Sequence, residues 1–303
     1  MTLATAPQGA ARTSILTARR LGKVFADFAK RPLALFGLIA ILGVSIAAIF
    51  APLLAPYPPG EQFFDGLTLE GAPLPPNETF LLGTDLLGRD LMSRLLYGAR
   101  TSLVIGIVAN GIAVVIGSMV GVTAGFFGGI VGSALMRFTD LMMAFPALLL
   151  AIVLAAILSP SLWIVVLVIA MVNWTQIARI TFTETRSLSE REFVEAEWSI
   201  GAGRARILFR HILPHLVPTM LVWGTLGVAT TVLLEATLSF LGIGVQPPTP
   251  SWGNIIFESQ TYFTSAPWLV FIPGACIVVL ALGFNLVGDA LRDILDPTQK
   301  GRF

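Results

Sequence analysis

Charged residues are scarce in this sequence. Of its 303 residues only 12% are Asp, Glu, Lys or Arg, whereas 55% are hydrophobic. Soluble globular domains carry about 25% charged residues, so this balance excludes an ordinary soluble enzyme or binding module. The net charge of +1 gives no indication of nucleic-acid binding, because the basic residues are scattered among loops and not gathered in a patch, and we expect no nucleic-acid partner. We therefore predict an all-α integral membrane protein.

Cysteine and the common catalytic motifs are also missing. Cys276 is the sole cysteine, so no intrachain disulfide forms. No G-x-x-x-x-G-K-[ST] loop is present to hold nucleotide phosphates, and neither H-E-x-x-H nor G-x-S-x-G occurs. The two histidines, His211 and His215, could share a helical face, but without a third ligand close by we assign them capping and interfacial roles rather than a metal site. The sequence thus predicts neither an enzyme nor a metal protein.

Long apolar runs are abundant instead. A membrane-spanning helix needs about 20 apolar residues, and the sequence holds six such stretches. We predict spans at 33–54, within 101–136, on either side of a turn at Ser159-Pro160-Ser161, at 216–241 and at 268–288.

The lysine and arginine distribution predicts the orientation. An even number of spans places both termini on one side, and the loops on that side hold sixteen of the 19 basic residues. The other side holds only Arg89, Arg94 and Arg100. We therefore expect both termini to be cytoplasmic. The first apolar run is too long and starts too late for a cleavable signal peptide, so we interpret it as an anchor.

Four regions follow from this topology. Residues 1–31 form a cytoplasmic arm, whose basic part rests on the lipids of the inner membrane surface. Residues 32–99 hold the first span, an extracytoplasmic loop and an interfacial helix, and 100–289 hold a core of five spans with a cytoplasmic loop at 184–214. Residues 290–303 form a cytoplasmic tail.

The stretch 189–214 is a polar island between apolar runs. Ser189 and Glu192 have the spacing of a capping box, which predicts a helix start. Gly201-Ala202-Gly203 predicts a left-handed corner, followed by a basic helix over 204–213. A solvated linker or a membrane-surface helix are the alternatives. Five glutamates among the arginines of 179–211 favour a protein surface as the partner.

At this island the sequence resembles the permeases of ABC importers. Their signature, E-A-A followed after three residues by G, matches Glu195-Ala196-Glu197 and Gly201, with a departure at Glu197, where the motif has alanine. The resemblance implies a MetI-like fold in which this loop is a coupling helix that docks on the ATPase. The coupling residues it implies are Glu195, Ala196, Glu197, Gly201, Arg204 and Arg206.

Three further strings resemble the dipeptide and oligopeptide (peptide/nickel) branch of that family: RPLALFGL, GTDLLGRDLMSRLLYGARTSL and GVQPPTPSWGN. From the residues alone, 83–103 is an interfacial helix in which Asp90 pairs with Arg94, and Trp252 belongs to an aromatic belt. The resemblance implies binding-protein docking or an outer mouth at Asp85, Arg89, Asp90, Gln246, Trp252 and Asn254.

The resemblance also implies the function. The chain is expected to be a permease subunit of an ATP-driven, binding-protein-dependent importer of di- or oligopeptides in the bacterial inner membrane. Its expected partners are a second permease, two ATPases that hold ATP and Mg, and an extracytoplasmic solute-binding protein, with transport by alternating access. The alternatives are an importer of nickel or another small solute, and a stand-alone secondary transporter, which would need ion-coupling carboxylates.

Three ionisable residues are predicted to be buried in or beside the spans: Glu235, Arg137 and Asp140. We expect Glu235 to bond to Thr230, Thr231 or Ser239, because no second ionisable group lies at its depth to form a proton relay. Arg137 and Asp140, three residues apart, are expected to pair with each other.

A stripe of small residues marks one helix face. Gly117, Gly121, Gly125 and Gly129 recur at every fourth position. Such a stripe lets a second helix approach closely, so we predict a helix-packing surface here rather than a pore wall.

Overall fold

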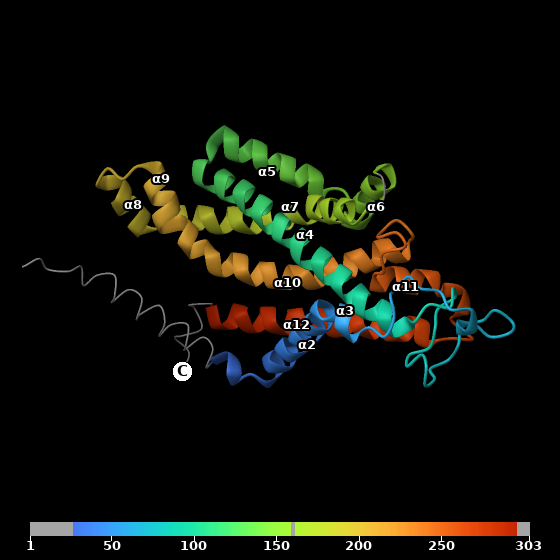
Figure 1. The fold of residues 1–303 in the computed structure, drawn as a ribbon. Helices are drawn as coiled ribbons and strands as arrows, with labels where there is room; N and C mark the ends of the chain where they lie inside the picture. Colours follow the sequence, from blue (N-terminus) through green and yellow to red (C-terminus); the bar gives the residue numbers. More distant parts are fainter. Residues whose placement is uncertain (1–26, 159–160, 296–303) are drawn as a thin grey trace, which may run out of the picture.

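The computed structural model describes residues 27–158 and 161–295, and these form a bundle of long helices (Figure 1). The principal elements are α2 (Pro32–Ile49), α3 (Ala51–Leu54), α4 (Leu91–Phe127), α5 (Gly129–Met143), α6 (Ala147–Ile157), α7 (Leu162–Ser189), α8 (Glu192–Ser199), α9 (Arg204–Ile207), α10 (Leu213–Phe240), α11 (Trp252–Glu258) and α12 (Trp268–Leu295). Within the described ranges extended structure is limited to two isolated bridges, Leu67 with Pro73 and Thr84 with Asp90.

The described helices provide five or six membrane crossings. Five helices are long and apolar enough to span a membrane by themselves, and α5 with α6, bent by 84°, makes a sixth if the pair is one broken span. The short helices α8 and α9 lie at the end of the bundle where the described chain starts and stops, and α11 lies at the opposite end (Figure 1). The predicted all-α architecture is therefore confirmed, and the number of crossings agrees with the six predicted when α5 and α6 are counted together.

The second span, predicted to lie within 101–136, ends at Phe127, because Gly128, with φ of 58°, ends α4 and the chain turns back into α5. The interfacial helix predicted over 83–103 is wrong. Residues before Leu91 form a loop, and Asp90 caps α4 by accepting a hydrogen bond from the Ser93 amide at 2.7 Å. From Leu91 onward this stretch is the first part of the second span.

The glycine stripe joins α4 to α7. A Cβ on Gly117, Gly121 or Gly125 would collide with the backbone or side chains of α7. These three glycines thus let the two helices pack backbone to backbone, as predicted. Gly129 does not belong to the stripe, since it begins α5 at φ of 53° and a Cβ there would meet open space.

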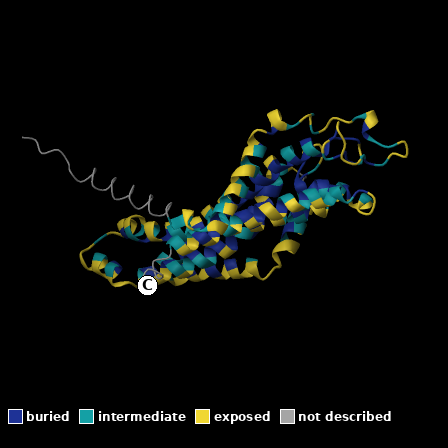
Figure 2. Cartoon of the chain, turned by 90° about the horizontal axis from the view of Figure 1, so that it is seen from below, coloured by how far each residue is buried: buried dark blue, intermediate teal, exposed yellow. Residues whose placement is uncertain are grey.

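Buried residues lie inside the bundle, and exposed residues lie on its outer faces and loops (Figure 2). One apolar core lies where α4, α10, α11 and α12 meet, around Leu91, Val232, Trp252 and Leu269. A second core joins α4, α6, α7 and α10. Large apolar side chains on the outer faces are exposed, among them Ile39 on α2 and Ile130 on α5. This is the pattern of a helix bundle whose outside faces lipid.

Some predictions fall outside the described residues. They are most of the basic arm at 1–31, the last part of the tail at 290–303, and two residues of the turn between the third and fourth spans. At the edge of the described chain, Arg31 forms an ion pair with Asp293 of α12.

Candidate functional site

The polar island folds as a short helix pair, but not through the predicted capping box. Ser189 is the last residue of α7, and its hydroxyl donates to the Thr185 carbonyl at 2.8 Å. Helix α8 begins after Arg191, which makes no side-chain cap. The serine therefore closes the preceding helix, because α7 continues several residues beyond the apolar run that marked it in the sequence.

The glycine corner is confirmed. Gly201 has φ of 78°, and a Cβ there would meet no other atom, so the left-handed backbone is what requires glycine at this position. Gly203, with φ of −70°, then precedes α9. A π-turn over Leu208–Ile212 connects α9 to α10, directly ahead of Pro214. The predicted basic helix is thus the first turns of the fifth span.

A small apolar core anchors this loop to the spans. Val194 of α8 and Ile207 of α9 are fully buried against Val122 of α4, Leu188 of α7 and Leu216 of α10. Burying each of these side chains contributes roughly 1.5–3 kcal/mol. This core therefore connects α8 and α9 to the ends of three spans.

The predicted coupling residues lie on the surface of this loop. Glu195, Ala196, Gly201, Arg204 and Arg206 are exposed. Glu197 is half-buried, and its carboxylate lies 3.2 Å from Nε2 of His211.

Apolar side chains are exposed beside these charges. Ile200 is 76% exposed, and Trp198 is 45% exposed although it stacks on Phe126. An exposed surface with acids, arginines and large apolar groups fits the surface of another protein better than it fits lipid headgroups.

His215 plays a local role. It stacks on Phe193 with ring centroids 5.5 Å apart, and its Nδ1 lies 2.5 Å from the carbonyl oxygen of His211. Within the described part of the chain, no group of three His, Cys, Asp or Glu residues lies close enough to hold a metal ion.

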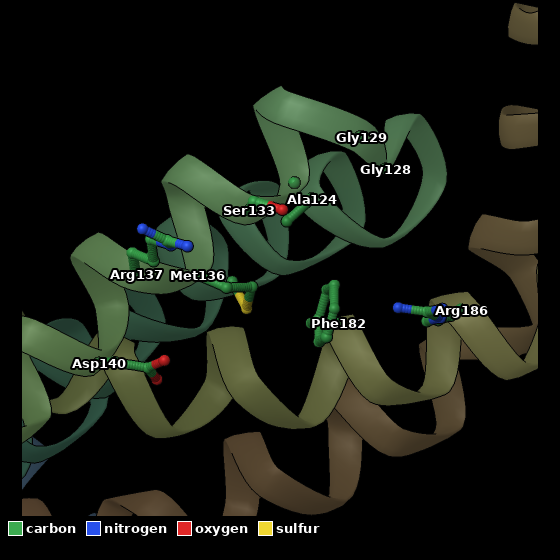
Figure 3. A pocket seen from close by; sticks show the side chains of 10 residues that line it. Ala124, Gly128, Gly129, Ser133, Met136, Arg137, Asp140, Phe182 and Arg186 are labelled. Atoms are coloured by element: carbon green, nitrogen blue, oxygen red, sulfur yellow. The ribbon is translucent and has the colours of Figure 1, made fainter.

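A cleft of about 250 Å³ opens between α5, the end of α4 and α7. Figure 3 shows Arg137 and Asp140 on α5 and Phe182 and Arg186 on α7 around it. The predicted burial of Arg137 and Asp140 is wrong, since both are exposed. Their predicted mutual pair is wrong as well, because Asp140 pairs with Arg179 of α7. A partner on the neighbouring helix could not be read from local spacing.

At the opposite end of the bundle four charged side chains form a buried ion cluster: Asp85, Arg89, Arg94 and Glu258. Asp85 accepts from Arg89 Nε at 2.6 Å and also from Arg94. Glu258 of α11 accepts from Arg89 at 2.5 Å and from Arg94 at 2.7 Å. The two positive and two negative charges thus neutralise each other, and their ion pairs join the loop before α4 to α11.

This cluster corrects the docking prediction. Asp85, Arg89 and Asp90 are buried, with 0%, 5% and 2% exposure, so their side chains are not available to a docking protein. The Asp90–Arg94 pair is also wrong, because Asp90 caps α4 and Arg94 pairs with Asp85 and Glu258. Glu258 was missed because 164 residues separate it from Arg94.

The expected outer-mouth residues hold the loop before α11 together. Trp252 is buried and its indole N–H donates to the Leu95 carbonyl at 3.0 Å, so the aromatic-belt interpretation is wrong for it. Asn254 is buried and closes a capping box with Ser251. Gln246 is half-buried and donates to the Gly242 carbonyl at 3.0 Å. Trp252 and Asn254 therefore shape the loop from inside and do not present a surface.

Glu235 is fully buried in α10, as predicted. Its carboxylate accepts hydrogen bonds from Ser239 at 2.8 Å and from Ser102 of α4 at 3.2 Å. Ser239 was among the expected partners, whereas Thr231 instead accepts from Asn173. Serine hydroxyls from two helices thus satisfy the carboxyl group inside the bundle.

The fold defines a class: an all-helical integral membrane protein in which the short helices α8 and α9 are anchored to the ends of three spans. The family model for the binding-protein-dependent transport system inner membrane component matches residues 91–301, and the model for the N-terminal transmembrane domain of oligopeptide transport permease C matches residues 20–76. The chain therefore belongs to the family of binding-protein-dependent transport system inner membrane components.

Relatives support this membership over nearly the whole chain. The chain is 42% identical over 285 residues to a di/tripeptide transport system permease protein of Pseudomonas aeruginosa, covering 92% of this chain and 93% of the relative. It is 38% identical to an oligopeptide transport system permease protein of Bacillus subtilis, covering 89% and 87%.

A solved structure supports the fold. A chain of the MetNI methionine ABC transporter in an inward-facing conformation matches with a TM-score of 0.57 at 19% identity, covering 68% of this chain and 98% of that one. The MetI-type permease fold implied by the sequence is confirmed.

Proposed function

We propose that this permease imports peptides delivered by an extracytoplasmic solute-binding protein, with a second permease completing the path and two ATPase subunits supplying the energy. ATP and Mg bind to the ATPases in this proposal. The peptide cargo is supported by the names of the relatives, which are permeases for dipeptides, di/tripeptides and oligopeptides.

The observation that carries the proposal is the anchored loop. Helix α8 presents exposed Glu195 and Ala196 on its surface while Val194, from the same turn, is fully buried in the core that joins three spans. A surface helix without a binding partner would not need to be packed so tightly against the spans. This arrangement suits an element that receives a displacement from outside and passes it to the bundle.

The start of α10 is the part of the bundle best suited to respond. The π-turn and Pro214 both interrupt the ordinary hydrogen-bond ladder, and Pro218 removes a further backbone donor inside the helix. In the proposed mechanism, closure of the ATPases displaces α8, and the weakened start of α10 allows the spans to exchange between inward- and outward-open arrangements.

The orientation follows from the same assignment. The end of the bundle that holds α8 and α9 faces the cytoplasm, as do both termini, because sixteen of the 19 lysines and arginines belong to that side. The end that holds α11 and the ion cluster faces the binding protein.

Purification and uptake together test the proposal. The tagged chain, extracted in a mild detergent from its native host, should retain a second permease and an ATPase, and the complex in vesicles should accumulate a dipeptide only with ATP and a loaded binding protein. A lone homodimer that moves solute without ATP would contradict the proposal and support a secondary transporter.

A further inference from the structure

A pocket lined by uncharged polar side chains lies within the spans, where α4, α7, α10 and α12 meet. Its volume is about 150 Å³, enough for several water molecules. We call it the amide pocket, and its polar lining residues are Asn110, Asn173, Gln176, Trp223, Thr230 and Asn285. None of the described residues that line it carries a charge.

Two of the amides are structural. Asn110, near the middle of α4, donates to the Gly224 carbonyl of α10 at 2.5 Å. Asn173 of α7 donates to the Thr231 hydroxyl of α10 at 3.1 Å. Each asparagine thus ties one wall of the pocket to α10, which fixes the distance between the walls.

The other two amides are free. Gln176 and Asn285 are exposed, and within the described part of the chain neither side chain makes a hydrogen bond. Moving an unpaired amide from water into hydrocarbon costs roughly 2–7 kcal/mol. Because both residues lie within apolar spans, this face of the bundle must meet water, substrate or protein rather than lipid tails.

A second cleft in the same bundle has a different lining. The cleft between α2 and α4 has a volume of about 340 Å³ and is lined mainly by aliphatic residues such as Ile49, Leu103 and Ile107, with Arg100 and Ser45 as its polar members. The lining of the amide pocket is therefore more polar than that of the cleft between α2 and α4, and this polarity needs an explanation.

We propose that the amide pocket is where this permease contacts the main chain of the transported peptide. A peptide backbone presents neutral N–H donors and C=O acceptors, and the free amides of Gln176 and Asn285 offer both kinds of partner. Hydrogen bonds to the backbone do not depend on the peptide side chains, and neutral partners hold a passing solute less tightly than charges do. This inference rests on the proposed peptide cargo and assigns the residues that contact it.

The free amides allow a test that leaves the fold intact. In the assembled importer, the double substitution Gln176→Leu/Asn285→Leu removes two free amides and no hydrogen bond within the chain. Uptake of trialanine is compared with uptake of the analogue in which an ester replaces its second amide and so lacks that N–H. The wild type and the variant use the same binding protein, so the preference of that protein for one solute cancels when the ratio of the two uptake rates is compared between them.

We expect the double leucine variant to lose about tenfold in trialanine uptake, as the loss of one or two hydrogen bonds predicts, and less than threefold in uptake of the ester analogue. The swapped variant Gln176→Asn/Asn285→Gln should restore most trialanine uptake.

Three results would overturn the assignment: unchanged trialanine uptake by the double leucine variant, an equal loss for both solutes, or loss of the second permease on purification, which would place the amides in a subunit interface. None of these three results would contradict the proposed function as a peptide importer. A wild-type complex that accumulates no peptide would instead contradict the proposed function, and the peptide assignment of the pocket with it.

Discussion

The two ends of this bundle treat charge in opposite ways. At the α11 end, Arg94 and Asp85 are 2% and 1% exposed and paired within the ion cluster. At the α8 end, Arg186 and Glu190 are 67% and 70% exposed and 3.4 Å apart. Breaking a buried pair by removing one partner costs about 3–5 kcal/mol, whereas an exposed pair contributes about 0–1 kcal/mol. The α11 end is therefore held in a fixed geometry by its ion pairs, whereas the charged side chains at the α8 end can exchange partners at little cost in free energy.

This difference matches the proposed work of each end. The ion cluster joins a loop before α4 to α11 and so resists separation of these elements. The surface of the loop at the other end is loosely paired, yet Val194 and Ile207 attach it firmly to the spans. A docking surface needs both properties, since it must bind a partner and also transmit that partner's movement.

The largest expected effect comes from breaking the contact that runs between the two ends. Gly121→Leu should abolish assembly, because a side chain there overlaps Thr181 and the Ala178 carbonyl of α7. Gly111→Leu is the matched control on the same helix, since a Cβ at Gly111 meets no atom of this chain. Yield of the complete complex measures both, and normal assembly of Gly121→Leu would show that α4 and α7 do not pack as described.

The ion cluster should give the next largest effect. Asp85→Ala leaves Arg89 and Arg94 buried with Glu258 alone, so the free energy of unfolding should fall by about 3–5 kcal/mol. Thermal unfolding of the purified complex measures the loss. Glu78→Ala, an exposed acid in the same loop, should leave the melting temperature unchanged. Equal stability of the two variants would show that the buried ion cluster does not stabilise the α11 end, which would contradict the proposed difference between the two ends.

Glu235→Gln should have a small effect. An amide has nearly the shape of the carboxyl group and can still bond to Ser102 and Ser239, so assembly and transport should both be retained. Solute uptake and ATPase activity of the variant are the measurements. A variant that assembles and hydrolyses ATP but moves no solute would show that the negative charge of Glu235 is needed.

The smallest effect is expected at the exposed pair. Arg186→Ala removes an ion pair that water and salt already weaken, so stability should change by less than about 0.5 kcal/mol. Thermal unfolding at low and high salt checks this. A loss comparable to that of Asp85→Ala would mean that the α8 end is as tightly fixed as the α11 end.

Features set by local sequence were predicted well. The apolar runs located the spans, the glycine stripe located a helix-packing surface on α4, and Gly201 marked the corner after α8, because each depends on residues close in the chain. Two local predictions were nevertheless wrong, the Ser189 capping box and the interfacial helix over 83–103. The other failures involve distant partners. Arg94 bonds to Glu258 and not to Asp90, and Asp140 bonds to Arg179 and not to Arg137. A charge in a mostly apolar bundle pairs with whichever opposite charge packing brings near, and spacing does not reveal that choice.

The site was predictable in part for the same reason. The coupling motif is continuous, so its residues were found together and lie together on α8 and at the corner that follows. The amide pocket draws on four helices, and its only signal in the sequence was the presence of Asn and Gln inside apolar spans.

The central claim is that α8 must be held in place by its glycine corner to transmit ATPase closure. Gly201→Val tests it most directly, because φ of 78° strains a β-branched residue while a Cβ there touches nothing else. Gly203→Val, at φ of −70°, is the matched control two residues away. Membrane abundance, ATPase retention and ATP-driven peptide uptake are measured for both. We expect Gly203→Val to behave as wild type, and Gly201→Val to reach normal abundance with weak ATPase retention and uptake reduced at least tenfold. Wild-type uptake by an abundant Gly201→Val permease would contradict the claim.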